Sequence, residues 1–185
     1  MKVVAKAAWL AASMWLGVSA GHAQTGEDDL SNRIISAPVP DQYRVDGAAS
    51  GARVRNDATV QFGKALRVPV PGRGEHAYAV AVAVPIVRAV QAGDNLVLAF
   101  WARLERGEDG ATSAILPYNA VQLASAPYTA LFTGPVTIGP EWQMHELRGR
   151  ADRDYAAGEL NVALHLATGR QTVDIGPVFV LDMDQ

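Results

Sequence analysis

The ten residues from Asn95 to Leu104 (Asn-Leu-Val-Leu-Ala-Phe-Trp-Ala-Arg-Leu) constrain the fold more than any other stretch. Successive side chains of a β-strand point to opposite faces, so this segment would have one wholly apolar face. That face consists of Leu96, Leu98, Phe100, Ala102 and Leu104. The other face carries Val97 and Ala99 and then ends in Trp101 and Arg103. The pattern predicts a central strand with one side on a hydrophobic core and an indole beside a guanidinium on the other side.

The same two-residue period recurs in other segments. From Tyr78 to Val84, Tyr78 and three valines alternate with Ala79, Ala81 and Ala83, which predicts a bulky core face and a flat outer face. From Leu160 to Leu166, four leucine and valine side chains would face inward and Asn161, Ala163 and His165 outward. In the last predicted strand, Asp174 and Asp182 are expected on a solvated outer face.

Strand-like segments of this kind fill most of the chain. There are about ten, separated by turns every 8–12 residues, and no convincing amphipathic helix interrupts them. The sequence therefore predicts an all-β protein, a jelly-roll β-sandwich of two antiparallel sheets without an internal repeat or a second domain.

The N-terminus carries a targeting pattern. Lys2 and Lys6 precede an apolar run, and Gly21-His22-Ala23 forms a small-x-small cleavage site. We interpret residues 1–23 as a signal peptide, residues 24–35 as an N-terminal arm and residues 36–185 as the β-sandwich. A cut after Ala20 and an uncleaved anchor are the alternatives. The protein is accordingly expected to be secreted or periplasmic, without membrane contact after cleavage.

The charge of the chain argues against two classes of partner. Lys and Arg number 16 and Asp and Glu 19, a net charge of −3, and loss of Lys2 and Lys6 with the signal peptide would make it −5. A mildly acidic chain without a basic tract is atypical of proteins that bind nucleic acid or anionic membranes.

No constellation of catalytic residues is visible. The chain has no Cys, residues 24–185 contain no Gly-x-Ser-x-Gly motif, and the four histidines lack metal-ligand spacing. The acidic residues gather in predicted loops, whereas a glycosidase needs two carboxyl groups across one cleft. The sequence therefore predicts no enzyme and no metal site. A glycoside hydrolase is the alternative, and it would require the carboxyl groups of two acidic residues to face one cleft.

The outward-facing polar and aromatic side chains suggest carbohydrate binding. Sugars stack their C–H faces on aromatic rings and form a few directed hydrogen bonds. We predict Trp101 as the stacking platform, Arg67 and Arg103 as hydrogen-bond donors, and flanking polar contacts from Gln122, Asn119 and His165. The alternatives are that Trp101 lies beneath a crossing loop, that Arg103 pairs with an acid, and that His165 is an ordinary surface histidine.

Several motifs, taken in order, resemble those of a known family. Lys64-Ala65-Leu66-Arg67-Val68, Leu98-Ala99-Phe100-Trp101-Ala102-Arg103, Glu141-Trp142-Gln143 and Leu164-His165-Leu166 are similar in order and spacing to carbohydrate-binding modules of the CenC type. The resemblance spans residues 36–182. It implies a galactose-binding-like jelly roll that binds a polysaccharide or oligosaccharide along a concave sheet face. Such modules are usually attached to polysaccharide-degrading enzymes, so a separate glycoside hydrolase is an implied partner.

The chain departs from this family at three places. Relatives often carry an aromatic residue near His76-Ala77-Tyr78; Tyr78 could supply it, although alternation places Tyr78 on the core face. Where some relatives have a Tyr-x-Glu pair, this chain has His165 and Ala167. The Asp-Asp pair with which many relatives hold structural calcium corresponds to Gly176-Pro177. We therefore expect no cofactor. The resemblance by itself would allow a structural calcium ion, but Gly176-Pro177 in place of the Asp-Asp pair argues against one.

A different class of function uses the same fold. The flat face of Ala79, Ala81 and Ala83 could pack against a partner protein or a second copy of the chain. The protein would then be a structural or interaction domain.

Overall fold

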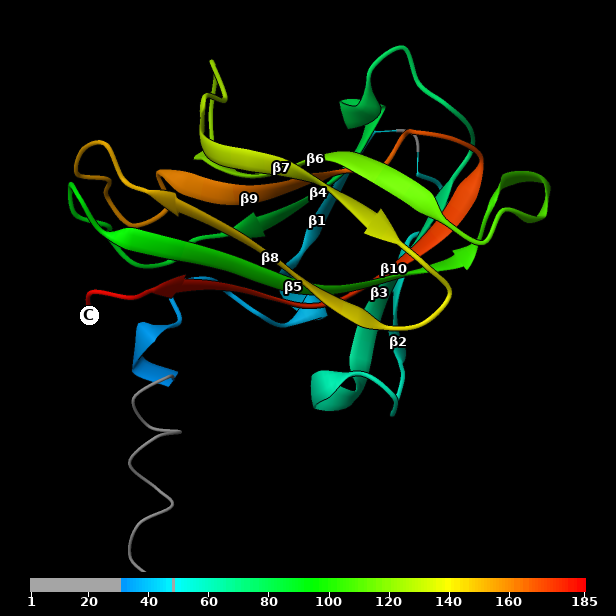
Figure 1. Cartoon of the computed structure of the whole chain (residues 1–185), viewed down its shortest axis with the longest axis horizontal. Coiled ribbons are helices and arrows are strands. Elements are labelled where there is room, and N and C mark those ends of the chain that lie inside the picture. Colours follow the sequence, from blue (N-terminus) through cyan, green and yellow to red (C-terminus); the bar gives the residue numbers. More distant parts are fainter. Residues whose placement is uncertain (1–30, 48) are drawn as a thin grey trace, which may run out of the picture.

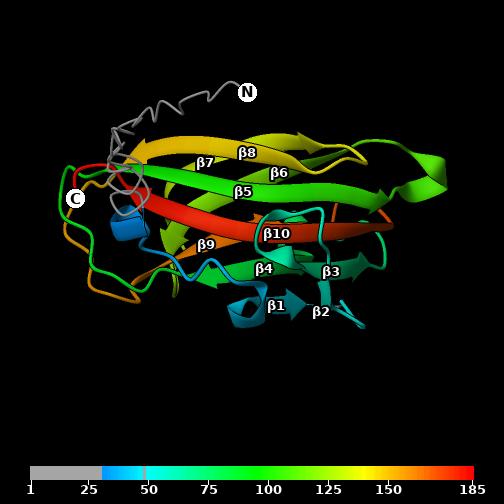
Figure 2. The ribbon, with the colours of Figure 1, turned by 90° about the horizontal axis from the view of Figure 1, so that it is seen from below.

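The computed structural model describes residues 31–47 and 49–185. They form a sandwich of two five-stranded antiparallel sheets, seen from two directions in Figures 1 and 2. Sheet 1 has the order β1-β4-β9-β6-β7, and sheet 2 has the order β2-β3-β10-β5-β8. The predicted all-β sandwich is thereby confirmed. The predicted signal peptide lies outside the described residues.

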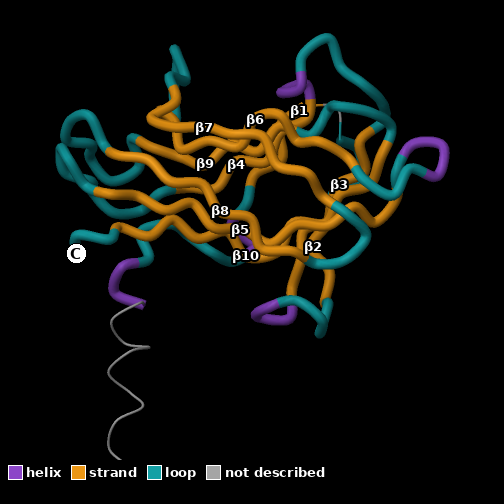
Figure 3. Tube along the Cα trace, viewed as in Figure 1, coloured by secondary structure: helices purple, strands orange, loops and turns teal. Residues whose placement is uncertain are grey.

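The strands are connected by turns and short 3₁₀ segments, as Figure 3 shows. Sheet 1 contains β1 (Arg44–Gly47), β4 (Val80–Pro85), β9 (Leu160–His165), β6 (Ala114–Leu123) and β7 (Ala130–Ile138). Sheet 2 contains β2 (Arg53–Asn56), β3 (Lys64–Val70), β10 (Gln171–Asp182), β5 (Asn95–Arg106) and β8 (Gln143–Arg150). The 3₁₀ segments are η1 (Pro40–Gln42), η2 (Gln61–Gly63), η3 (Ala77–Ala79) and η4 (Glu108–Gly110). In the described part of the chain, no helix has the length and apolar character needed to cross a membrane.

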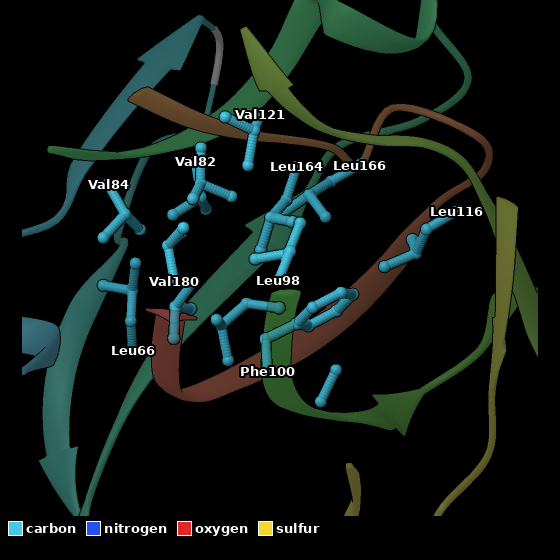
Figure 4. Packing of buried hydrophobic residues seen from close by; sticks show 14 of the residues in the cluster. Leu66, Val82, Val84, Leu98, Phe100, Leu116, Val121, Leu164, Leu166 and Val180 are labelled. Carbon is cyan, nitrogen blue, oxygen red and sulfur yellow. The ribbon is translucent and has the colours of Figure 1, made fainter. Parts of the chain in front are cut away.

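The hydrophobic core lies between the sheets, where β5 faces β4 and β9 (Figure 4). All five inner residues of β5 are at most 3% exposed, as the alternation predicts. The valines of β4 and the inward-facing residues of β9 meet them from sheet 1. Full burial of each large apolar side chain contributes about 1.5–3 kcal/mol, so this layer stabilises the sandwich.

The segment before η1 ties the two sheets together. Ile34 forms a bridge with Leu181, Ser36 forms one with Ile86, and Ile35 is fully buried. The Ser36 hydroxyl donates to the Val178 carbonyl at 3.0 Å and accepts from the Val180 N–H at 2.8 Å. The sandwich therefore includes Ile34 and Ile35, within the region predicted as an N-terminal arm.

Candidate functional site

A groove of about 1000 Å³ lies on the outer face of sheet 1. We call it the groove. Its floor comes from β4, β9 and β6, its rim at β1 carries Arg44 and Asp46, and its two ends carry the 75–78 segment and the β6–β7 loop. The floor residues are Ala81, Ala83, Tyr118, Gln122, Asn161, Ala163 and His165.

The groove exists because β4 alternates large and small side chains. Val80, Val82 and Val84 fill the core, whereas Ala81 and Ala83 put only methyl groups on the outer face. The 75–78 segment and the β6–β7 loop rise at the two ends of this low floor. The alanine face is therefore the bottom of a groove and not the flat surface that the sequence suggested.

Four rings follow one another at the His165 end. His76 stacks on Tyr78 with centroids 4.7 Å apart, Tyr78 meets His165 edge to face at 5.8 Å, and His165 stacks on Tyr118 at 4.3 Å. Tyr78 is 56% exposed. Its placement on the core face was wrong, because residues 77–79 form η3 and β4 begins only at Val80.

Another ring stands at the opposite end of the groove. Tyr128, in the loop between β6 and β7, is 54% exposed and lines the groove. It follows the end of β6, where Gln122 pairs with Asn161. From Asn161 to His165 the floor extends for about 13 Å, at the usual rise of a strand. Exposed tyrosine rings thus stand at both ends of a polar floor, an arrangement that sequence alternation alone did not reveal.

The floor is uncharged near neutral pH. Burial lowers the pKa of His165 to about 4, so its imidazole is neutral at pH 7. Burial also raises the pKa of the Tyr118 hydroxyl, which stays protonated. The charged groups are Arg44, Asp46 and Glu75 of the rim and the 75–78 segment, and the Arg44 Nε lies 2.9 Å from an Asp46 carboxylate oxygen. The chemistry of the floor is therefore that of rings, amides and hydroxyl groups.

Two amides occupy the floor beside these rings. The Tyr118 hydroxyl donates to the Gln122 Oε1 at 2.9 Å, which fixes the Gln122 side chain. Asn161 is 8% exposed, and its buried Oδ1 accepts no hydrogen bond from any described residue. Buried amides that keep unused hydrogen-bonding groups are uncommon in folded proteins.

The six residues predicted as a carbohydrate site are divided between the sheets. Gln122 and His165 lie in the groove, whereas Trp101, Arg103 and Arg67 lie on the outer face of sheet 2. The core separates these two surfaces, so the six side chains do not form one site. Alternation predicts which way a side chain points relative to its own sheet, and it does not predict which sheet its strand joins.

Asn119 belongs to neither surface. It is fully buried, and its Nδ2 donates to the carbonyl groups of Leu116 and Gly134, both at 2.9 Å. The pairing of β6 with β7 shifts register between Leu116 and Asn119. The Asn119 amide thus fills the gap that this bulge leaves in the ladder, so the expected contact position on a surface was wrong.

On sheet 2, the predicted arginine donors are held by a buried acid. Asp174 is fully buried and accepts hydrogen bonds from Arg67 at 2.8 and 2.9 Å, from Arg103 at 3.0 Å and from Arg55 at 3.0 Å. The hydrogen bond to Asp174 raises the pKa of Arg67. The expectation that Asp174 lies on a solvated face was wrong, because the arginine side chains cover it. Asp182 is fully buried as well.

Trp101 faces outward from sheet 2 and is half-buried. Its Nε1 donates to the Gln61 Oε1 in η2 at 3.2 Å. Next to it, the Arg103 guanidinium lies over the Trp142 ring, 4.9 Å from the centroid. The 3₁₀ turn η2 thus lies against this indole. This arrangement resembles the alternative in which Trp101 lies beneath a crossing loop.

One group of acidic residues could hold a cation. The carboxylates of Asp94, Asp182 and Asp184 lie within 4.8 Å of one another at the end of β10. Burial, followed by the nearby Asp94 carboxylate, raises the pKa of Asp182. Hydrogen bonds from backbone N–H groups of Gln91, Asn95 and Asp184 already reach the three acids. Oxygen ligands of this kind suit calcium, and they lie away from Gly176-Pro177.

Comparison with known proteins adds the class of fold. No family model matches the sequence, and no curated protein matches it either. Among solved structures, the chain is similar to the two N-terminal cellulose-binding domains of Cellulomonas fimi β-1,4-glucanase C. For the first domain the TM-score is 0.52 at 17% identity, over 78% of this chain and 91% of that chain. For the second it is 0.55 at 14% identity, over 80% and 90%.

A second group of similar structures consists of xylan-binding domains. The CBM22-1 domain from Paenibacillus barcinonensis Xyn10C matches with a TM-score of 0.50 at 8% identity, over 81% of this chain and 91% of that chain. In a Clostridium thermocellum xylanase structure that joins CBM22-1 to GH10 modules, the match covers only 29% of that chain. The protein therefore shares the β-sandwich fold of these carbohydrate-binding modules.

Proposed function

We propose that the protein is a non-catalytic carbohydrate-binding module that holds a polysaccharide or oligosaccharide in the groove on sheet 1. The observation that carries this proposal is the placement of exposed tyrosine rings at both ends of an uncharged floor of amides. Rings provide stacking surfaces for the C–H faces of sugars, and amides exchange hydrogen bonds with hydroxyl groups.

The groove offers enough contacts for useful affinity. One ring face that covers about 100 Å² contributes about 2.5 kcal/mol, and each net hydrogen bond adds about 1 kcal/mol. Millimolar binding needs about −4 kcal/mol after the cost of association. A single ring is therefore insufficient, whereas the Tyr78 and Tyr128 rings together supply about 5 kcal/mol and the Gln122 and Asn161 amides add hydrogen bonds to it. On sheet 2, by contrast, Asp174 already engages Arg67 and Arg103.

Two features favour binding over hydrolysis. The only carboxylates in the described lining of the groove are Asp46 and Glu75. Both belong to the side formed by β1 and the 75–78 segment, whereas a glycosidase places two carboxyl groups on either side of the scissile bond. Asp46 is also paired with Arg44.

The proposal includes a location and a partner. The predicted signal peptide at residues 1–23 supports export to the periplasm or the medium. The similar structures include domains of a glucanase and of xylanases, which supports action beside a separate glycoside hydrolase.

Affinity electrophoresis and isothermal calorimetry against soluble β-glucan, xylan, mannan, galactan and pectin test the proposed function. We expect at least millimolar affinity for one neutral polysaccharide, and a loss of about tenfold or more in Tyr78→Ala and in Tyr128→Ala. Phe62→Ala is the control, because Phe62 is 60% exposed and lies beside Phe179 of sheet 2. Absence of binding to every polysaccharide, or equal losses in all three variants, would contradict the proposal.

The alternative function, a structural or interaction domain, can be tested with the same protein samples. Sedimentation that shows a concentration-dependent mass, together with no response to any glycan, would favour docking through Ala81 and Ala83.

A further inference from the structure

The Asn161 side chain is the least satisfied polar group of the groove floor. It lies on β9 directly opposite Gln122 of β6, a cross-strand pair in which Cβ atoms are about 4.5–5.5 Å apart. Asn161 is 8% exposed and Gln122 7%. Both amides line the groove, so they form one polar patch near the Tyr128 end of the floor.

The two amides differ in the hydrogen-bonding groups that they have left. Gln122 accepts a hydrogen bond from Tyr118, so its Oε1 is engaged and its Nε2 keeps donors for a ligand. No hydrogen bond joins Asn161 Oδ1 or Nδ2 to any of the described residues. A buried carboxamide that stays unpaired lowers stability, because it has lost water without gaining a partner.

We propose that the Asn161 carboxamide binds two neighbouring free hydroxyl groups of one sugar ring, and that the groove thereby selects glycans with unsubstituted vicinal diols. This inference rests on the proposed function. A carboxamide carries a donor and an acceptor side by side in one plane. It therefore donates to one hydroxyl oxygen through Nδ2 and accepts from the adjacent hydroxyl through Oδ1.

The surroundings of Asn161 make this recognition selective. The Asn161 carboxamide turns about χ2, a torsion with a broad profile, to bring its covered oxygen to the ligand. An acetyl or methyl group on the hydroxyl that donates to Oδ1 removes the donated proton, and such a group on either hydroxyl adds bulk against Asn161 and Gln122, which are both more than nine-tenths buried. The Gln122 amide, held by Tyr118, donates to a hydroxyl group beside the same position.

The test combines two variants with two forms of the same ligand. Asn161→Ala removes the carboxamide, and Asn161→Leu replaces it by an apolar group of similar size. For both variants we expect roughly thirtyfold weaker binding of alkali-deacetylated xylan or glucomannan, as the loss of two net hydrogen bonds of about 1 kcal/mol each implies. For the wild-type protein we expect naturally acetylated samples of the same polysaccharides to bind several-fold more weakly than the deacetylated ones. Asn56→Ala, at the end of β2 on sheet 2, is the matched control for which no change is expected.

Thermal unfolding distinguishes recognition from a structural role. The midpoint should be unchanged or higher in the Asn161 variants, because they lose an unpaired buried amide and no internal hydrogen bond. A lower midpoint together with weaker binding would show a structural role and overturn the inference. Wild-type affinity in both variants, or equal affinity for acetylated and deacetylated ligand, would overturn it while leaving the proposed function intact. Absence of wild-type binding to any polysaccharide removes the proposed function itself.

Discussion

The stability of the sandwich should depend strongly on the buried Asp174 of sheet 2. Replacement of Asp174 by Asn keeps the size of the side chain but removes the charge that balances three arginines. The arginine side chains are between 17% and 30% exposed, whereas Asp174 itself is fully buried. The variant would leave cationic groups facing a neutral amide in a largely dry environment.

The magnitude follows from these exposures. Removal of one partner of a fully buried ion pair costs about 3–5 kcal/mol. The partly exposed arginines retain access to water, and Arg67 and Arg103 also reach Glu105, at 2.7 and 3.2 Å. We therefore expect Asp174→Asn to lower the free energy of unfolding by about 3 kcal/mol. With an m-value near 2 kcal/mol/M, the urea midpoint would fall by about 1.5 M.

Urea unfolding followed by circular dichroism measures this change. Asp109→Asn is the matched control, because the Arg170–Asp109 pair is 68% and 87% exposed and should contribute less than about 1 kcal/mol. Equal midpoints for the two variants would refute the role of Asp174. The glycan affinity of folded Asp174→Asn should equal that of the wild type, since the groove lies on the other sheet. A large loss of glycan affinity in Asp174→Asn would instead indicate that Arg67 and Arg103 on sheet 2 form the binding site.

Three further predictions concern other parts of the sandwich. Burial holds the pKa of His165 at about 4 in the folded state, against 6.5 in the unfolded chain, so the unfolded chain binds more protons between these two pH values. The free energy of unfolding should therefore fall by about 1–2 kcal/mol as the pH drops from 6.5 to 4. Urea titrations should give a flatter pH profile for His165→Gln than for the wild type, and an identical profile would contradict this. Gly149→Ala would place its Cβ 2.1 Å from a Phe132 ring carbon and should cost about 1–3 kcal/mol in thermal unfolding, whereas Gly72→Ala, with nothing within 4 Å, should be neutral. Tyr43→Phe removes the hydroxyl that accepts from the Val178 N–H at 2.8 Å, and calorimetry should show a loss of about 1–3 kcal/mol, which an unchanged transition would disprove.

The sequence predicts the fold well because alternation is a direct consequence of strand geometry. The inner faces of β5 and β9 and the valines of β4 all lie in the core where the period places them. A strand in which large apolar side chains alternate strictly with other residues has one favourable register. A shift of that register by one residue would expose the whole apolar set to solvent.

The candidate site is harder to predict, because it depends on pairing between distant segments. Trp101 and His165 both point outward, but β5 and β9 belong to different sheets. Tyr78 does not follow the strand alternation, because it lies in a 3₁₀ turn that ends just before β4. Asn119 points inward because a bulge shifts the register of β6 against β7. The burial of Asp174 required three arginines from three strands, which no local pattern encodes.

The position of the two described tryptophans decides which optical assays will be informative. Trp101 faces outward from sheet 2, the Trp142 ring lies against Arg103 of the same sheet, and the rings of the groove are tyrosine and histidine. Quenching or spectral shift of indole emission, the customary screen for sugar ligands, should therefore stay silent even when the groove is saturated. A tryptophan introduced at Tyr78 or Tyr128 would create a reporter at the ligand, and it would read out occupancy against two native indoles that serve as an internal reference.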